Sequence, residues 1–178
     1  MEGLQKDNII LIGFMGSGKT SVGRQLAKLL GYDFQDTDTL IEQQEQETIA
    51  HMFETKGEEH FRELETAILK RLQSELNHTV LSTGGGLVLR EQNRELLRRM
   101  GYVIYLQASN GTIVDRVMGD TTRPLLQGEE LRAKVERLQR ERKPIYTRTA
   151  HKLIRTDDKT PKAIAEEIIS DYRREYFV

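Results

Sequence analysis

The sequence predicts an α/β fold with three layers, in which a central parallel sheet of about five strands lies between two layers of helices. Almost continuous apolar segments occur at 8–12, 79–82 and 102–106, with weaker ones at 32–36 and 152–154. Such segments are typical of strands that are buried on both faces. Helical patterns alternate with them along the chain, and this alternation favours parallel strands that are joined by helices.

The helical patterns follow the strands in order. Leucine, isoleucine and alanine recur at steps of three and four residues, as on the buried face of a helix, at 21–30, 61–76, 90–100 and 161–177. Two segments fit the alternation poorly: one at about 38–62, rich in Gln and Glu, and "GDTTRPLLQGEE" at 119–130. We expect both to be excursions from the core and the second to be a mobile loop.

Length and composition limit the class of protein. The 178 residues fit a single domain, 1–178, that can bury a sizeable core. The formal net charge of -1 predicts no general attraction to nucleic acid or to an anionic membrane. The chain has no cysteine, which excludes disulfides and thiolate metal sites, and no segment has the length and apolar character of a membrane span. We therefore expect a cytoplasmic protein whose anion sites are local.

The sequence "GFMGSGKT" at 13–20 matches the pattern G-x-x-x-x-G-K-[ST] between a predicted strand and a predicted helix. Glycines allow successive N–H groups to turn inward, and the amino end of a helix adds a partial positive charge, so the loop can hold a phosphate. A glycine-rich turn with an incidental lysine is the alternative, but the strand-to-helix context favours nucleotide binding. The predicted nucleotide-binding residues are Gly16, Ser17, Gly18, Lys19, Thr20 and Ser21, with Thr20 as a ligand of Mg²⁺.

A kinase also needs a second site that holds the hydroxyl acceptor. The N-K-x-D and D-x-x-G segments of guanine-specific switch proteins do not occur, whereas Asp36 and Asp38 follow the second predicted strand, beside the phosphate loop. One aspartate can support the shell of the magnesium ion, and the other can orient or deprotonate the acceptor. Helix capping is the alternative, but Thr39 and Glu42 form a capping-box pattern of their own and leave both aspartates available.

Other candidates for this second site are weaker when each is taken alone. Arg62 has acidic neighbours at i−4 and i+3, which by themselves indicate an exposed ladder of charges. The glycines at 84–86 follow the third predicted strand and would let a ligand approach the backbone closely. Arg123 lies in the predicted mobile loop and could fold over the phosphates. Arg142 ends a charged helical run just before Pro144.

Taken together, "GFMGSGKT", "DTD", "GEEHFRELE", "STGGG", "RPLL" and "RKPIY" resemble the shikimate kinase family in order and spacing, over essentially the whole chain. The resemblance implies a P-loop kinase fold with a helical substrate-binding segment at about 38–65 and a mobile lid at about 117–131. It also implies transfer of the γ-phosphoryl group of ATP, with Mg²⁺, to the 3-hydroxyl of shikimate. The products would be 3-phosphoshikimate and ADP, on the route to chorismate and the aromatic amino acids.

The resemblance also implies roles for single residues. Asp38 would hold the shikimate hydroxyls and act as the base or orienting group, while Asp36 would support Mg²⁺. The substrate carboxylate would lie between Arg62 and Arg142, a suitable pair because a guanidinium matches a carboxylate in geometry. The implied catalytic residues are Lys19, Asp38 and Arg123, with Arg123 also contacting the nucleotide. The implied substrate-binding residues are Asp38, Arg62, Gly84, Gly85, Gly86 and Arg142.

The adenine contacts have the weakest pattern in the sequence. For the adenine, the family pattern maps loosely onto Arg116 and the segment 155–161, where the sequence does not choose between Arg155 and Lys159.

The segment "TRTA" after Tyr146 departs from the family, in which an acidic residue is common. The site is complete within one chain, so we expect a monomer. The alternatives are a gluconate kinase, a nucleoside monophosphate kinase and a catalytically inactive nucleotide-binding regulator.

Overall fold

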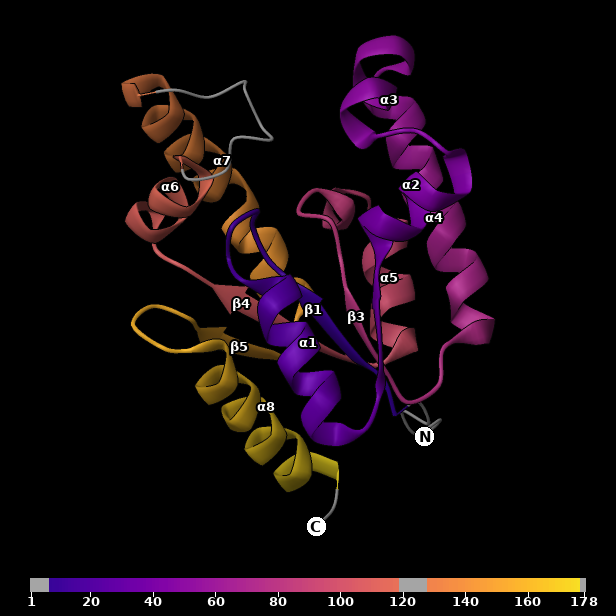
Figure 1. Cartoon of the computed structure of the whole chain (residues 1–178), viewed down its shortest axis with the longest axis vertical. Helices are drawn as coiled ribbons and strands as arrows, with labels where there is room; N and C mark the ends of the chain where they lie inside the picture. The colour runs from indigo at the N-terminus through magenta and orange to yellow at the C-terminus, as the bar shows by residue number, and fades with distance from the viewer. Residues whose placement is uncertain (1–6, 119–127, 177–178) are drawn as a thin grey trace.

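A computed structural model describes residues 7–118 and 128–176. Its five strands form one parallel sheet in the order β2-β3-β1-β4-β5, flanked by helices (Figure 1). The strands are β1 Ile9–Ile12, β2 Asp33–Asp36, β3 Thr79–Ser82, β4 Tyr102–Gln107 and β5 Lys152–Arg155. The helices are α1 Lys19–Leu30, α2 Thr37–Glu45, α3 Ile49–Lys56, α4 Glu58–Glu75, η1 Leu87–Leu89, α5 Glu91–Met100, α6 Asn110–Met118, α7 Gly128–Thr149 and α8 Pro161–Tyr176. The fold class and all five strands predicted from the sequence are confirmed.

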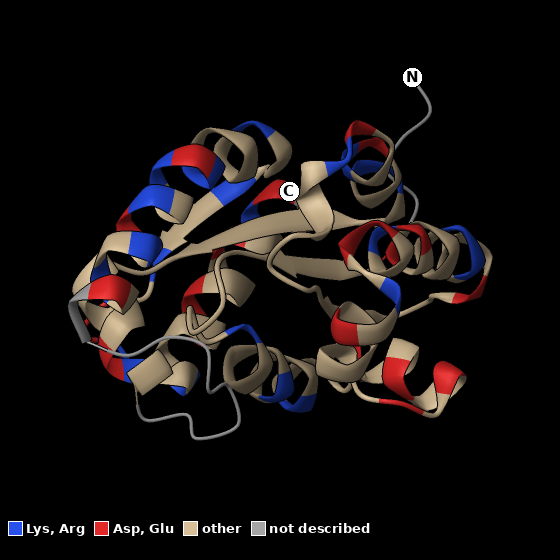
Figure 2. Cartoon of the chain, turned by 90° about the horizontal axis from the view of Figure 1, so that it is seen from above, with Lys and Arg blue, Asp and Glu red and all other residues tan. Residues whose placement is uncertain are grey.

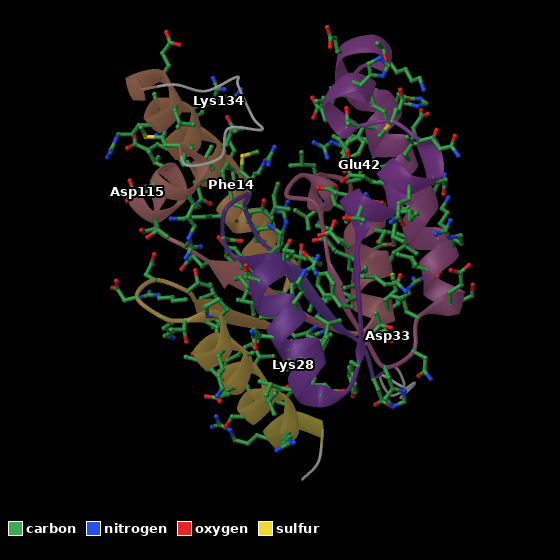
Figure 3. All side chains as sticks on the ribbon, viewed as in Figure 1. Phe14, Lys28, Asp33, Glu42, Asp115 and Lys134 are labelled. Atoms are coloured by element: carbon green, nitrogen blue, oxygen red, sulfur yellow. The ribbon has the colours of Figure 1, made fainter. Side chains whose placement is uncertain are left out.

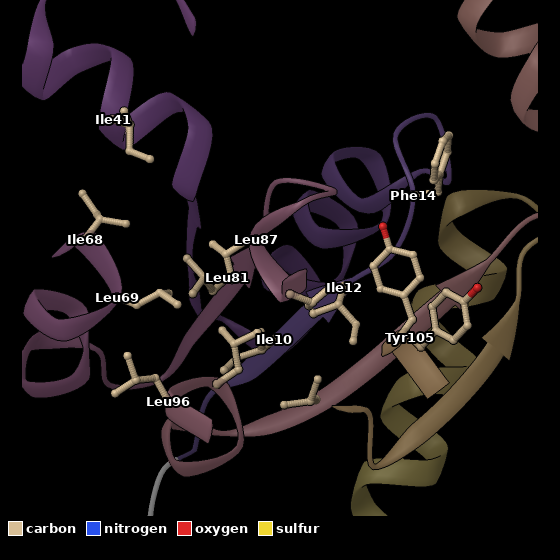
Figure 4. Close-up of a cluster of buried hydrophobic side chains, with 14 of the residues drawn as sticks. Ile10, Ile12, Phe14, Ile41, Ile68, Leu69, Leu81, Leu87, Leu96 and Tyr105 are labelled. Atoms are coloured by element: carbon tan, nitrogen blue, oxygen red, sulfur yellow. The ribbon is translucent and has the colours of Figure 1, made fainter. Parts of the chain in front are cut away.

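The two faces of the sheet are covered by different helices. Along β1, Ile9 and Leu11 pack with α1 and α8, whereas Ile10 and Ile12 pack with residues of α4, α5 and η1. This alternation follows from the two-residue period of a strand. Figure 4 shows the cluster that contains Ile10 and Ile12, to which α2 also contributes Ile41. Both faces are therefore buried, as the continuous apolar segments predicted.

The strand order places the loops of interest at one end of the sheet. β1 lies between β3 and β4. The strands that follow β1 in the chain, β2 and β3, lie on one side of it, and the next two, β4 and β5, lie on the other side, so the strand order reverses at β1. In such sheets ligands bind at the carboxyl ends of the strands where the order reverses. Phe14, after β1, and Glu42, in α2, lie at this end, while Asp33 at the start of β2 lies at the other (Figure 3).

The excursion predicted at 38–62 is regular structure. It consists of α2, α3 and the beginning of α4, and together with the rest of α4 it connects β2 to β3. The expected cap is wrong: Asp36 is the N-cap of α2, and its Oδ1 accepts a hydrogen bond from the Thr39 N–H at 3.1 Å. Asp36 still has extended dihedrals and lies three residues before that N–H, which is the geometry of a capping side chain. One oxygen of Asp36 is thus engaged in capping.

A second correction concerns the helix that carries Arg142. This helix, α7, does not end before Pro144 but continues to Thr149 with the proline inside it. The missing proline N–H costs one helical hydrogen bond, whereas the buried side chains of Val135 and Tyr146 keep the helix against the core on both sides of it. Arg142 and Tyr146 therefore lie one turn apart on one continuous helix.

The predicted lid at 117–131 is only partly described. Its flanks belong to α6 and α7, and Arg123 lies outside the described residues. Basic and acidic residues are interspersed on the helices that surround the sheet (Figure 2). Within 7–118 and 128–176, no helix has both the length and the apolar character required to cross a bilayer.

Candidate active site

The loop between β1 and α1, residues 13–20, is called the phosphate loop below, and its shape depends on glycine. Gly16 and Gly18 have φ values of 73° and 96°, in the left-handed region that other residues rarely adopt. At Gly13, a Cβ would lie 2.6 Å from the carbonyl oxygen of Leu106 on the neighbouring strand β4. The loop can therefore follow this path only with glycine at these positions, as the sequence pattern predicted.

Lys19 is the first residue of α1, and its side chain turns back over the phosphate loop. Its Nζ donates hydrogen bonds to the carbonyl oxygens of Gly13 at 2.7 Å and Phe14 at 2.8 Å. The residue is only 9% exposed. The ammonium group thus lies inside the curve of the loop, beside the amino end of a helix, where a phosphate would find both the cation and the helix dipole.

The remaining residues of the predicted nucleotide site lie in the same turn. Ser17 is buried, while Thr20 and Ser21 are exposed in the first turn of α1. From α6, Arg116 donates a hydrogen bond to the carbonyl oxygen of Gly16 at 2.8 Å. The segment predicted for the adenine is tied to the end of β4, since Asp157 Oδ1 accepts from the Ser109 N–H at 3.1 Å. Lys159 pairs with Glu167 of α8.

Asp38 lies beside the glycines that follow β3. The register of β2 and β3 pairs Asp36 with Ser82, so the residues after each strand leave the sheet side by side. The Gly84 N–H donates to the buried hydroxyl of Thr37 at 3.0 Å. A Cβ on Gly84 would lie 2.6 Å from Oδ1 of Asp38, so only glycine allows this approach.

Arg62 reaches the same glycine segment from α4. Its Nη1 donates to Oε1 of Glu65 at 2.6 Å, and its Nη2 to Oε1 of Glu58 at 3.1 Å. A Cβ on Gly86 would overlap the guanidinium, with only 2.6 Å to Cζ. The side chain of Arg62 is 11% exposed, so the expectation of an exposed ladder is wrong for Arg62 itself, and Gly86 leaves the space that it occupies.

Arg142 approaches the glycines from α7. Its guanidinium lies over the ring of Phe14, with Cζ 5.6 Å from the ring centroid, and its Nη1 is 3.7 Å from the position of a Cβ on Gly85. Phe14 belongs to the phosphate loop, so this arginine connects the two parts of the site. The structure therefore brings together Asp38, Arg62, Gly84, Gly85, Gly86 and Arg142, and we call this set the acceptor site.

Glu65 belongs to this region and was not predicted. Its side chain is fully buried, and a Cβ on Gly84 would lie 3.1 Å from its Oε2. Burial raises its pKa from the ordinary 4.5 to about 7 against the opposing effect of the Arg62 guanidinium, and the nearby Asp38 also raises it. The available signal was its position three residues after Arg62, which places both side chains on one face of the helix.

Comparisons with known proteins point to one family. The family model described as shikimate kinase matches residues 15–173. The chain belongs to the shikimate kinase family. A shikimate kinase from Thermodesulfovibrio yellowstonii is 42% identical over 94% of this chain and 95% of its own length. Another, from Thioalkalivibrio sulfidiphilus, is 46% identical over 95% of this chain and 88% of its own length.

A solved structure extends the agreement to three dimensions. The shikimate kinase from Acinetobacter baumannii in complex with shikimate superposes with a TM-score of 0.91 at 39% identity, covering 98% of this chain and 97% of that one. As a shikimate kinase family member, the chain is an ATP-dependent kinase that acts on shikimate. The family match decides against the gluconate kinase and nucleoside monophosphate kinase alternatives.

Proposed function

We propose that this chain uses the acceptor site to hold shikimate while the γ-phosphoryl group of ATP, held at the phosphate loop, is transferred to the 3-hydroxyl. The observation that carries this assignment is that Arg62 and Arg142, from two different helices, approach neighbouring glycines of one segment. Two guanidinium groups at this spacing suit a small carboxylic acid, and the glycines let the acid lie against the backbone.

The carboxylate of shikimate would bind between Arg62 and Arg142. In the part of the chain that the structure describes, the N–H groups of Gly85 and Gly86 donate to no protein acceptor, so both can donate to the substrate. Arg62 is already oriented by Glu58 and Glu65, which reduces the side-chain entropy that binding would cost. This arrangement selects an anionic acceptor over a neutral sugar.

Asp38 would accept a hydrogen bond from the attacking hydroxyl. It lies in the first turn of α2, beside Gly84, at the end of the sheet where the phosphate loop also lies. Phosphoryl transfer passes through a loose transition state, so catalysis depends mainly on position and charge. Lys19 would neutralise the transferring group, and we assign the same function to Arg123 from the family pattern alone.

The residues present suit Mg²⁺. Thr20 offers a hydroxyl at the phosphate loop, and Asp36 offers the carboxylate oxygen that is not used to cap α2. Mg²⁺ at a nucleotide takes most of its ligands from phosphates and water, so one or two protein oxygens are sufficient. Thr20 and Asp36 would hold Mg²⁺ beside the phosphate loop, where it would supply positive charge for the transferring phosphoryl group. Because every assigned residue comes from one chain, we also propose that the monomer is the active form.

The direct test is ADP release from Mg-ATP by the purified protein, with shikimate, gluconate, AMP or no acceptor in parallel. We expect release that depends on shikimate, with 3-phosphoshikimate as the product. Release with gluconate or AMP instead would refute the assignment of the acceptor site while retaining that of the phosphate loop. If every acceptor failed while ATP still bound, the chain would be an inactive nucleotide-binding regulator.

A further inference from the structure

Tyr146 occupies an unusual position behind the acceptor site. The residue is fully buried in the core, and its ring packs on that of Tyr105 with 5.0 Å between the ring centroids. Its hydroxyl donates a hydrogen bond to the carbonyl oxygen of Gly85 at 2.6 Å. Burial raises the pKa of Tyr146 to about 12, so the phenol remains a donor at neutral pH. None of the roles assigned above uses this residue.

The carbonyl of Gly85 belongs to the peptide that also carries the Gly86 N–H. That peptide is trans, like all described peptide bonds, so its carbonyl and its N–H point in opposite directions. The hydrogen bond from Tyr146 holds the carbonyl toward α7, and therefore turns the Gly86 N–H away from α7. Glycine has wide freedom in φ and ψ, so without this bond the peptide could rotate.

Arg142 belongs to the same helix as Tyr146, so this hydrogen bond also relates Arg142 to the glycines. Arg142 lies one turn before Tyr146 on α7, which continues through Pro144. Its Nη1 is 3.7 Å from the position of a Cβ on Gly85, the residue whose carbonyl Tyr146 holds. A change in the distance between Tyr146 and Gly85 would therefore move the guanidinium and the Gly86 N–H relative to each other.

We propose that Tyr146 is a positioning residue of the acceptor site. Its hydroxyl fixes the peptide between Gly85 and Gly86 to α7, so that the Gly86 N–H and the Arg142 guanidinium meet the substrate carboxylate together. This inference rests on the proposed function of the acceptor site and adds a specificity-determining contact that does not itself touch the substrate.

The test compares Tyr146→Phe with Tyr105→Phe. Each variant removes one buried hydroxyl from the same pair of rings, but among the described residues the hydroxyl of Tyr105 makes no hydrogen bond to the glycine segment. We expect Tyr146→Phe to raise the KM for shikimate about tenfold, with the KM for ATP changed less than about twofold. Tyr105→Phe should leave both constants near those of the unsubstituted protein. Melting temperatures of both variants show whether either has lost its fold.

The outcomes separate the two proposals. An unchanged KM for shikimate in Tyr146→Phe, or an equal rise in both KM values, would overturn the positioning role and leave the proposed function intact. If calorimetry shows no binding of shikimate to the unsubstituted protein, the proposed function fails first and the positioning role with it.

A second measurement needs no variant and therefore does not depend on folding of Tyr146→Phe. Amide hydrogen exchange of the unsubstituted protein should slow at Gly86 when shikimate is added. The Gly84 N–H is a matched reference, because it already donates to Thr37. Exchange at Gly86 that is unaffected by saturating shikimate would overturn the proposal.

Discussion

The phosphate loop and the acceptor site lie at the same end of the sheet but are built in different ways. The phosphate loop is one continuous segment, residues 13–20, shaped by glycines with positive φ and closed by Lys19 from the same segment. The acceptor site gathers side chains and backbone from α2, α4, the segment after β3 and α7. A site made of backbone can be recognised in a short pattern, whereas a site made of distant side chains depends on the packing that brings them together.

The largest effect should come from Asp38→Asn, which tests whether the acceptor site can fail alone. We expect a loss of about a thousandfold in kcat. The attacking hydroxyl is oriented by a negatively charged hydrogen-bond acceptor, and the neutral amide of asparagine cannot replace it. Binding of ATP, measured by calorimetry, should stay within about twofold. Asp33→Asn, an exposed aspartate at the other end of β2, is the control. If ATP binding also collapsed, the two regions would not be independent.

Glu65→Gln tests the charge state of the buried carboxyl group beside the acceptor site. The folded-state pKa of about 7 exceeds the ordinary 4.5, so the folded protein binds a proton that the unfolded chain releases between these values. The free energy of unfolding should therefore fall as pH rises from about 4.5 to about 7, by up to about 3 kcal/mol. Glu65→Gln should lack this component.

Urea unfolding of the two proteins at about pH 5 and about pH 8 measures the difference. The control is Glu63→Gln, an exposed glutamate on the same helix. Parallel pH dependence in Glu65→Gln and the unsubstituted protein would show that Arg62 keeps Glu65 ionised throughout this range.

Gly86→Ala sharpens the comparison between the two sites. In the phosphate loop, glycines allow an unusual backbone conformation, whereas Gly86 leaves space for the side chain of Arg62. A Cβ would overlap the Arg62 guanidinium and displace it, so we expect the KM for shikimate to rise about 10- to 100-fold. The KM for ATP should change little. Gly111→Ala is the matched control, since a Cβ there meets nothing within 4 Å. Steady-state kinetics that show equal changes in both variants would argue against this space-filling role.

The smallest effect should come from Arg116→Gln, which removes a side chain of α6 that contacts the phosphate loop. Loss of its hydrogen bond to Gly16 should raise the KM for ATP about 3- to 10-fold and leave that for shikimate unchanged. Arg99→Gln, an exposed arginine on α5, is the control. An unchanged KM for ATP would mean that the phosphate loop holds its shape entirely by itself.

The same contrast explains what the sequence could predict. The strands and the phosphate loop are local patterns, so apolar runs and the spacing of glycines were sufficient to find them. The sequence neighbours of Arg62 gave only weak evidence that it binds substrate, because acidic partners at these spacings also suit a solvated helix face. Only the family pattern gave Arg62 a role. The only local feature that separates the buried Glu65 from the exposed Glu63 is its position three residues after Arg62, and the same spacing also suits an ion pair on a solvated helix face.

The two corrected elements have physical causes that a local pattern does not contain. The capping box at Thr39 competed with Asp36, which also prefers the cap position and lies next to the end of β2, so the helix begins earlier. Pro144 normally ends or bends a helix, but tertiary packing of Tyr146 outweighs the lost hydrogen bond and carries α7 onward. Similarly, Tyr146 became informative only when its hydroxyl was seen against Gly85.

The three helices between β2 and β3 form one insertion whose two ends leave and re-enter adjacent strands. Such an insertion could in principle be transplanted as a module to change what a kinase of this fold accepts. Here, however, the module would bring Asp38 and Arg62 but leave behind Arg142 and the glycines, which belong to the framework that also holds the phosphate loop. Redesign of the acceptor, in evolution or in the laboratory, must therefore alter the module and the framework in step.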